Sequence, residues 1–586
     1  MADLGEREQY RQRRRKPRPA REPTETQIHK DVSDAYDLVP ELGNGYRWYD
    51  WPYRFLYWFG TGWRRRLYPR AFGTRVWRGL SWLIPFNEHD RNKVWSRENW
   101  LRNIFVAEDE HVNVAGIWLV ELFPPTELPS LEAALDRNGW NKKPLTMPLD
   151  GNNREKLSKA RAASGLMWWR LADLMDWDSN WLSGGDSIRT RLPDEFTMIE
   201  LRAVQIGPSL TAVIAEFHLT DEAATALDGE WHKTHEPILM RGKPRWRSLN
   251  RKEAAYWRVQ SKRRQLHSAA REWLTDKLPG FFTSNGEQLP LLDLMLFDKI
   301  DPTTAPPANL SREKAVARED AYRALGISTH EYYQATSPDL PKLVLSPLDG
   351  RMHGALGEAP TWTLWGRRDA VVKALGEGGL AGYGGTDTNR AIASRLVDNM
   401  FNLFVMLAVS EFLHVTGKKY AVLRDRASTR HGKFRPRALR ELRKSFLTLS
   451  LNLSSVQPDV SDFWSRNWRW DGDAQFTYNV APRYKAMDRK AGRKIDDPID
   501  YNADLKERQE KEFARLIAAD RDYRDILSTV ASLGASADSF KLGRIALWVA
   551  IVSLVVAVAT VLLSELSGNS VLGWLWTLLR NWAGWA

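Results

Sequence analysis

The sequence predicts an α+β cytoplasmic body of mixed helices and short sheets, followed by a long C-terminal stalk helix and a C-terminal transmembrane helix. Three observations predict this class: an uncharged apolar run near the C-terminus, a charged helical segment directly before it, and short apolar runs alternating with helical patterns over residues 101–500. The chain has 586 residues, a length that suits about three to five folding units, and 43% of the residues are hydrophobic. The body at 101–500 is expected to form one or two of them.

The apolar run covers residues 545–563, and its 19 residues include no charge, glycine or proline. At about 1.5 Å per residue, this helix would reach roughly 28 Å, close to the hydrocarbon thickness of a bilayer. We therefore expect a transmembrane helix over 543–565. Lys541 and Arg544 precede the apolar run 545–563, and this positive charge predicts that the chain before the run is cytoplasmic. No apolar signal segment follows the basic residues 11–21. The residues expected to anchor this helix in lipid are Ile545, Trp548, Leu554 and Leu563.

A shorter apolar segment, residues 570–586, follows the turn SELSGNS. Trp574, Trp582 and Trp585 fall on one helical stripe, which is typical of a helix lying among lipid headgroups. A short second span is the alternative. The two interpretations place the C-terminus on opposite sides of the membrane.

Residues 501–540 predict a stalk helix resembling a coiled coil. Its apolar positions alternate in spacings of three and four, as in the seam of a coiled coil. The seam residues are Leu516, Tyr523, Ile526, Val530 and Leu533, with Ala519 between the first two. Because the seam is shorter than about three heptads, a helix packed on its own domain is the alternative. Attachment to a membrane raises the effective concentration of the chains, so we expect a homo-oligomer.

The N-terminal region predicts contact with a lipid surface. Residues 1–30 form a basic tail that we expect to be disordered. Residues 31–100 are rich in Trp and Arg, including Arg64, Arg65 and Arg66. Such a mixture suits a headgroup layer, a single-stranded nucleic acid, a protein interface or a plain core. The membrane anchor in the same chain favours lipid, so anionic headgroups are the expected partner and nucleic acid is the less favoured one.

Within the body, apolar runs alternate with helical patterns. Strands are predicted at 111–122, 197–219 (two strands joined at Gly207-Pro208), 342–348, 361–365 and 475–480. Helices are predicted at 250–275, 387–413 and 436–453. In the second strand of 197–219, Glu216 and His218 share one face, and the apolar residues share the other.

The helix predicted at 250–275 crowds basic residues on its surface. Arg258, Lys262, Arg263 and Arg264 form a candidate patch for an anionic partner. A solvated helical face is the simpler interpretation.

The sequence contains little that indicates chemistry. With no cysteine, the chain has no disulfide, thiolate metal site or cysteine nucleophile. It lacks the nucleophile-elbow, dinucleotide-binding and kinase motifs, so we predict no catalytic residue and no cofactor. His232 and His235, with Asp228 upstream, are candidates for binding a metal ion. Residues 108–111, all acidic or His, predict a solvated turn before a strand. The glycine-rich run 376–391 predicts a surface loop.

The order of parts resembles that of CorA-type divalent cation channels: a cytoplasmic body, a long helix, a C-terminal membrane segment and a short tail. The likeness covers the layout alone, because the family's Gly-Met-Asn motif is absent from the segment SELSGNS. We expect a membrane-anchored, cytoplasm-facing binding or scaffold module at the inner leaflet, oligomeric through its stalk. The alternatives are a cation channel or transporter with this layout, and a membrane-tethered nucleotide or nucleic-acid effector.

Overall fold

The computed structural model divides the chain into two compact units. Unit 1 comprises Met1–Val415 and Ser455–Lys511, and unit 2 comprises Thr416–Ser454 and Glu512–Ala586. The residues that the structure describes are 50–91, 104–142, 151–163, 167–177, 187–233, 235, 238–241, 246–305, 312–329, 331–347, 360–376, 380, 388–430, 436–465, 474–564, 571–582 and 584. The predicted basic tail at 1–30 lies outside them.

Unit 1 is built on one eleven-stranded sheet in the order β13-β12-β9-β10-β11-β8-β1-β5-β4-β2-β3. Its neighbouring strands are antiparallel, except for the parallel pairs β8/β11 and β2/β3. The strands are β1 (Val112–Phe123), β2 (Met167–Met175), β3 (Ile188–Arg189), β4 (Phe196–Gln205), β5 (Thr211–Leu219), β8 (Leu291–Phe297), β9 (Tyr333–Thr336), β10 (Leu343–Pro347), β11 (Thr361–Arg367), β12 (Thr477–Val480) and β13 (Ile499–Asp500). A separate hairpin joins β6 (Ile238–Arg241) to β7 (Trp246–Leu249). The mixed helix-and-sheet class predicted from the sequence is confirmed.

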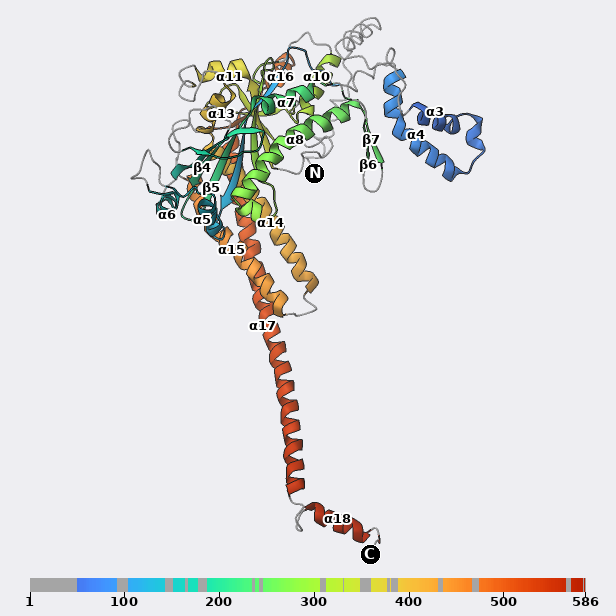
Figure 1. Cartoon of the computed structure of the whole chain (residues 1–586), viewed down its shortest axis with the longest axis vertical. Coiled ribbons are helices and arrows are strands. Elements are labelled where there is room, and N and C mark those ends of the chain that lie inside the picture. The colour runs from blue at the N-terminus through green and yellow to red at the C-terminus, as the bar shows by residue number, and fades with distance from the viewer. Residues whose placement is uncertain are drawn as a thin grey trace. The chain divides into compact units, whose positions relative to one another are not determined.

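The described helices precede, separate and follow these strands. They are α3 (Asp50–Gly60), the 3-10 helix η1 (Trp63–Arg66), α4 (Arg70–Arg91), α5 (Leu128–Arg137), α6 (Asn153–Ala162), α7 (Asp221–Trp231), α8 (Arg251–Lys277), α9 (Phe281–Ser284), α10 (Arg312–Ala324), α11 (Arg368–Leu375), α13 (Asn389–Val397), α14 (Phe401–Arg430), α15 (Pro436–Ser465), α16 (Pro482–Lys490), α17 (Tyr501–Ser564) and α18 (Val571–Trp582). Figure 1 shows α8 running along the sheet of unit 1.

Helices cover both faces of the central strands. Successive side chains of a strand point to opposite faces, so the sheet carries two kinds of cross-strand row. The row with Phe217 faces α8, where its ring centroid lies 5.8 Å from that of Trp273. The row with Trp118 faces α14, where the corresponding distance to Phe404 is also 5.8 Å. Burial on both faces explains why β1 and β5 consist mostly of apolar residues.

The predicted strands at 111–122 and 197–219 match β1, β4 and β5, and the three later ones match β10, β11 and β12. No strand was predicted from the sequence at β2 or β8, nor at the short strands β3, β6, β7, β9 and β13. The run LLDLMLF of β8 interrupts its leucines with Asp293, so it lacks the alternation of a half-buried strand. The predicted helix at 387–413 is two helices, α13 and α14, which are bent by 73° at the break.

Helices α3 and α4 form a hairpin rich in aromatic residues. Its apolar interior is thin and includes Val76, Leu80 and Leu83, with Leu56 packed against Leu83. Most of its aromatic rings are exposed. Exposed large hydrophobic side chains in the hairpin are Trp51, Phe55, Tyr57, Trp58, Trp63, Leu67, Phe72 and Trp77.

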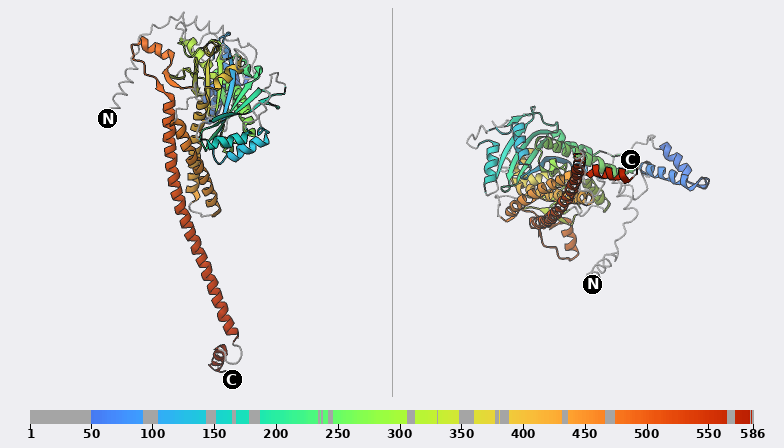
Figure 2. Two further views of the ribbon diagram at one scale, coloured as in Figure 1. Left: turned by 90° about the vertical axis from the view of Figure 1, so that its left-hand side faces the viewer. Right: turned by 90° about the horizontal axis from the view of Figure 1, so that it is seen from below.

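Unit 2 contains the end of α14, the beginning of α15, most of α17, and α18. Helix α17 is one unbroken helix of 64 residues (Figures 1 and 2). Asp520 is buried in unit 2, where it accepts hydrogen bonds from the hydroxyls of Tyr420 at 2.7 Å and Ser450 at 3.0 Å. Farther along the same helix, Gly543–Thr560 has a mean hydropathy of 2.1, and none of it is buried. By length and composition, this helix could span a membrane.

Candidate metal centre and buried charged clusters

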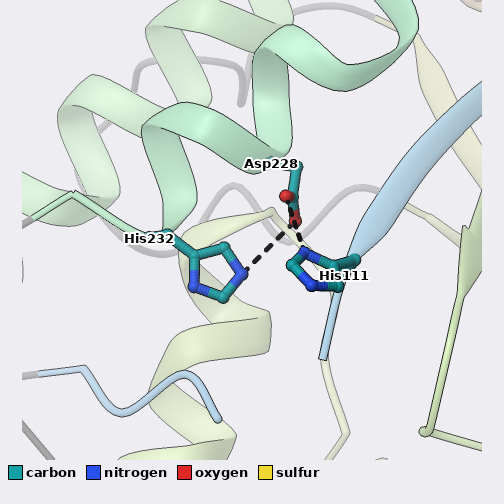
Figure 3. Close-up of side chains that lie close together, drawn as sticks. All are labelled: His111, Asp228 and His232. Atoms are coloured by element: carbon teal, nitrogen blue, oxygen red, sulfur yellow. Dashed lines mark hydrogen bonds and ion pairs between the residues drawn. The ribbon is translucent and has the colours of Figure 1, made fainter. Parts of the chain in front are cut away.

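Three metal-ligating side chains converge at the beginning of β1. Among the described residues, His111, Asp228 and His232 form a group whose ligand atoms all lie within 4.8 Å of one another. His111 Nδ1 lies 3.0 Å from Asp228 Oδ2, and His232 Nε2 lies 3.4 Å from Asp228 Oδ1. Figure 3 shows both imidazoles beside this carboxylate. Two imidazoles and one carboxylate are a ligand set that zinc uses in catalytic sites.

The fold positions these groups through α7 and the first residues of β1. Asp228 and the C-cap residue His232 are four residues apart and lie on one face of α7. The backbone N–H of Val112 donates to Asp228 Oδ1 at 2.9 Å, which orients the carboxylate. His111 is 47% exposed, so the group is accessible from solvent. The hydrogen bond to Asp228 is the main cause that raises the pKa of His111.

His235 lies outside this group. Its ring is buried, and its Nε2 lies 3.0 Å from the carbonyl oxygen of Glu230. Burial lowers the pKa of His235, although Glu230 acts in the opposite direction. The structure therefore places His232 with His111 and Asp228 and not with His235. All three members stand out in the sequence as metal-ligating or polar residues, but nothing in the sequence shows that the residue before β1 meets α7.

Glu110 is buried at 2% exposure and does not belong to a solvated turn, which corrects that part of the sequence interpretation. Its carbonyl oxygen lies 2.9 Å from His232 Nε2. Its carboxylate accepts hydrogen bonds from the backbone N–H of Lys299 and from the hydroxyl of Tyr322, both at 2.9 Å. Glu110 therefore contacts both the segment after β8 and the group of His111, Asp228 and His232, called the His–Asp group below.

A cavity of 480 Å³ lies beside this segment, with Trp365 and Tyr322 among its lining residues. Three cations line it, and each has an acidic neighbour. The ion pairs are Lys299–Asp109 at 3.4 Å, Arg318–Glu110 at 3.9 Å and Arg483–Glu319. The cavity has the size of a small-molecule site, but these pairs leave its lining close to neutral.

On the α13 face of the sheet, three carboxyl groups form one cross-strand row. Asp173 pairs in register with Glu200, and Glu200 pairs with Glu216. Adjacent like charges are unfavourable, and Arg202 offsets them at 3.1 Å from Glu200 and 3.5 Å from Glu216. The imidazole of His218 lies 3.3 Å from Glu200. The sequence correctly placed Glu216 and His218 on one face, but their burial under α13 depends on the fold.

In this row, the pKa values of the neighbouring residues Glu200 and Glu216 are shifted in opposite directions. Burial raises the pKa of Glu216. Burial also acts to raise that of Glu200, but His218 and Arg202 outweigh it and hold the pKa below its ordinary value. The buried Nδ1 of His218 has no hydrogen-bond partner among the described residues, whereas its Nε2 lies 3.3 Å from Glu200. Two carboxyl groups whose pKa values are shifted in opposite directions, beside an imidazole, can hold and transfer a proton.

The opposite face of the sheet buries a second charged group. Arg263 is 0% exposed, and its Nε and Nη2 lie 2.8 Å and 2.7 Å from the Asp293 carboxylate. His267 Nε2 lies 2.9 Å from the same carboxylate. Arg263 therefore belongs to the core and not to a surface patch. The other members of the predicted patch, Arg258, Lys262 and Arg264, are exposed or half-buried.

The remaining predicted residues lie on the membrane segments and the stalk. Ile545, Trp548 and Leu554 are 59%, 64% and 65% exposed on α17, and Trp574 and Trp582 are 67% and 88% exposed on α18. The side chain of Leu563 and residue Trp585 lie outside the described part. In η1, the Arg64 guanidinium lies 4.2 Å from the Trp58 ring centroid, and Arg65 and Arg66 are exposed.

Two members of the predicted seam make contacts within the chain itself. Leu516 is buried, and the ring centroid of Tyr523 lies 5.4 Å from that of Phe446. Ile526, Val530 and Leu533 belong to α17, but their side chains lie outside the described part.

No protein-family model, curated protein or solved structure matches this chain.

Proposed function

We propose that this protein is a membrane-anchored binding module whose α+β body faces the cytoplasm. The observation that carries this proposal is the exposed apolar window Gly543–Thr560 of α17. Burial of one large apolar side chain away from water is favourable by about 1.5–3 kcal/mol. A bilayer is therefore the favourable surrounding for a helix that is apolar on every side. Lys541 and Arg544 favour the cytoplasmic orientation of the preceding chain.

The same window argues for an anchor more than for a pore. An ion pathway needs polar groups along one helix face. The polar side chains within Gly543–Thr560 are Arg544 at one end, Ser553 in the middle and Thr560 at the other end. We therefore favour the binding module over the cation channel.

The test of the anchor is a charged substitution in its centre. Val552 and Val555 are 56% and 61% exposed. Replacing both with Arg should make the free energy of membrane insertion less favourable by about 5–7 kcal/mol, at about 2.5–3.5 kcal/mol for each Arg. We expect the wild-type chain to stay with membranes after alkaline carbonate extraction and the double variant to be released.

The matched control carries Leu447→Arg and Leu451→Arg on α15, where the two leucines are 54% and 51% exposed. The control must remain with the membrane. Retention of the Val552→Arg/Val555→Arg variant in the membrane fraction would show that α17 is not the anchor.

We propose the hairpin α3–α4 as a second contact with anionic headgroups. Seven arginines and no acidic residue occur between Asp50 and Glu88, namely Arg54, Arg64, Arg65, Arg66, Arg70, Arg75 and Arg78. The rings of Trp51 and Phe55 stack with centroids 5.3 Å apart, and both rings are exposed. Aromatic rings and arginines together are the side chains that suit the headgroup layer.

A chain ending at residue 540 tests the hairpin without the anchor. We expect it to float with vesicles that contain phosphatidylserine and not with phosphatidylcholine alone. At about 1 kcal/mol per basic residue, Arg65→Gln with Arg66→Gln should weaken binding roughly 30-fold. Trp51→Ala should also weaken binding, whereas Trp177→Ala, which removes an equally exposed ring (both 63%), should not. Equal flotation of all variants would exclude the hairpin as the lipid contact.

A further inference from the structure

We propose that His111, Asp228 and His232 form a Zn²⁺ site in unit 1, where the beginning of β1 meets the end of α7. This inference concerns the body and does not depend on the membrane anchor.

The spacing of the ligand atoms suits one tetrahedral ion. Zn–N and Zn–O bonds of about 2.0–2.2 Å place ligand atoms of a tetrahedron roughly 3.3–3.6 Å apart. The separations from Asp228 oxygens are 3.0 Å to His111 Nδ1 and 3.4 Å to His232 Nε2. The ring centroids of the two imidazoles are 5.2 Å apart. All three ligand atoms lie within 4.8 Å of one another, so one ion could contact all three once the more distant atoms move closer.

The ligands are oriented before any ion arrives. The N–H of Val112 donates to Asp228 Oδ1 at 2.9 Å, and this oxygen keeps a second lone pair for a metal. His232 follows Trp231, whose buried indole donates to the carbonyl of Ala321 at 2.8 Å. This fixed neighbour holds the backbone of His232 in place. Orientation of the first ligands by surrounding groups is a general feature of metal sites.

The donor set determines the class of ion. Imidazole nitrogens favour zinc and neighbouring transition metals over Mg²⁺ and Ca²⁺, which prefer oxygen. Three protein ligands leave a fourth position for water or another oxygen. The carbonyl oxygen of Glu110 lies 2.9 Å from His232 Nε2, so a metal bound to this nitrogen replaces that hydrogen bond. The exposure of the three side chains, 47%, 18% and 27%, gives the ion a path from solvent.

The competing explanation is a hydrogen-bonded link between α7 and β1. In that case a proton lies between His111 and Asp228, and His232 donates to the carbonyl of Glu110. Zinc binding requires both nitrogens to present a lone pair, so the proton on each must leave. The two explanations therefore differ in whether the protein binds zinc at all.

The test is metal binding to the full-length protein in detergent after chelator treatment. Co²⁺ serves as the spectroscopic probe and Zn²⁺ as its competitor. We expect one Co²⁺ per chain, visible absorption of a tetrahedral N/O site, and displacement by Zn²⁺. Zinc should also raise the unfolding temperature, because it binds the folded state.

His111→Asn and His232→Gln should each weaken binding by at least about tenfold. The side-chain amide of Asn occupies nearly the position of His Nδ1, so His111→Asn keeps a donor toward Asp228 and separates metal binding from folding. His414→Gln changes an exposed histidine on α14 and should bind like wild type. The inference is overturned if wild type binds no Co²⁺ at micromolar metal, or if the His111 and His232 variants bind as well as the His414 control.

Discussion

At the residue scale, the interior of unit 1 contains buried charged side chains. Partners on other helices or strands offset the free-energy cost of removing these charges from water. Arg263 from α8 and Asp293 from β8 are both 0% exposed and paired at 2.7 Å. Burial acts to raise the pKa of Asp293, but Arg263 and His267 outweigh it and hold the pKa well below its ordinary value. Burial lowers the pKa of His267 to about 4, so the imidazole is neutral near pH 7.

Replacement of Arg263 by Met should destabilise the protein by about 3–5 kcal/mol, because it leaves the Asp293 carboxylate buried without its main partner. Arg263→Met combined with Asp293→Asn should recover a large part of this loss. Chemical denaturation of the detergent-solubilised protein measures both. Arg258→Met removes an exposed arginine of the same helix and should change stability by less than about 0.5 kcal/mol. Equal effects at positions 258 and 263 would contradict the buried pair.

Glu121 is another buried acidic residue, and it lies at the beginning of α9. Its carboxylate accepts from the backbone N–H groups of Phe282 at 2.9 Å and Thr283 at 3.1 Å. Burial raises the pKa of Glu121 to about 7, although these hydrogen bonds act in the opposite direction.

This shift makes stability depend on pH. Between about pH 4.5 and 7, the unfolded chain loses the Glu121 proton while the folded chain retains it, so stability falls as pH rises. A rise of the pKa from 4.5 to about 7 corresponds to roughly 3 kcal/mol over this window. Between about pH 4.5 and 7, we expect the unfolding free energy of Glu121→Gln to fall less than that of the wild type. The measurement is the difference in unfolding free energy between variant and wild type at several pH values. A difference that stays constant with pH would be contrary to this expectation.

At the element scale, close approach of β1 and α13 depends on Gly116. A Cβ added at Gly116 would lie 2.9 Å from the Cβ of Ala393, which is closer than side chains normally pack. The same strand has a register irregularity between Val114 and Gly116 opposite β8. Helix α13 therefore packs on the sheet at the one residue of β1 that has no side chain.

Gly116→Ala should destabilise the protein by about 1–3 kcal/mol, because α13 must move outward. With Ala393→Gly added, the loss should be smaller than the sum of the two single losses, which double-mutant denaturation measures as a coupling free energy. Gly229→Ala is the control, since nothing lies within 4 Å of a Cβ at that position of α7. It should stabilise by about 0.5–1 kcal/mol. Additive losses at 116 and 393 would exclude this contact.

Sequence patterns identified the elements whose pattern is local and missed those whose identity depends on neighbours. The apolar runs of β1 and β10 are recognisable in isolation. Strand β8 is recognisable only beside its partners, because the charge of Asp293 in this buried strand is paired with Arg263 of α8. The His–Asp group shows the same limit, since 117 residues separate His111 from Asp228.

At the scale of the whole molecule, α17 joins the last part of unit 1 to the apolar window of unit 2 without a break. Leu516 and Tyr523 already contact their own chain in unit 2, so only part of the predicted seam is available to a second copy. We propose that oligomer formation depends on confinement in a membrane, where effective concentration is high.

This proposal predicts two different states. A chain ending at residue 540 should be monomeric at micromolar concentration in sedimentation, whereas the full-length protein in vesicles should cross-link into oligomers. The control is Val552→Arg/Val555→Arg, which should behave like the truncated chain. Oligomers of the truncated chain, or an absence of cross-linked full-length chains in vesicles, would refute the dependence on the membrane.

The α+β class and the apolar C-terminal helix could be predicted from the amino-acid sequence, because both follow from local composition and periodicity. The internal position of Arg263, the burial of Glu110 and the meeting of His111 with Asp228 and His232 depend on how the chain folds. The physical reason is that hydrophobic periodicity is a property of neighbouring residues along the chain. A buried charge or a set of metal ligands, in contrast, depends on partners that the folding of distant segments brings within a few ångströms.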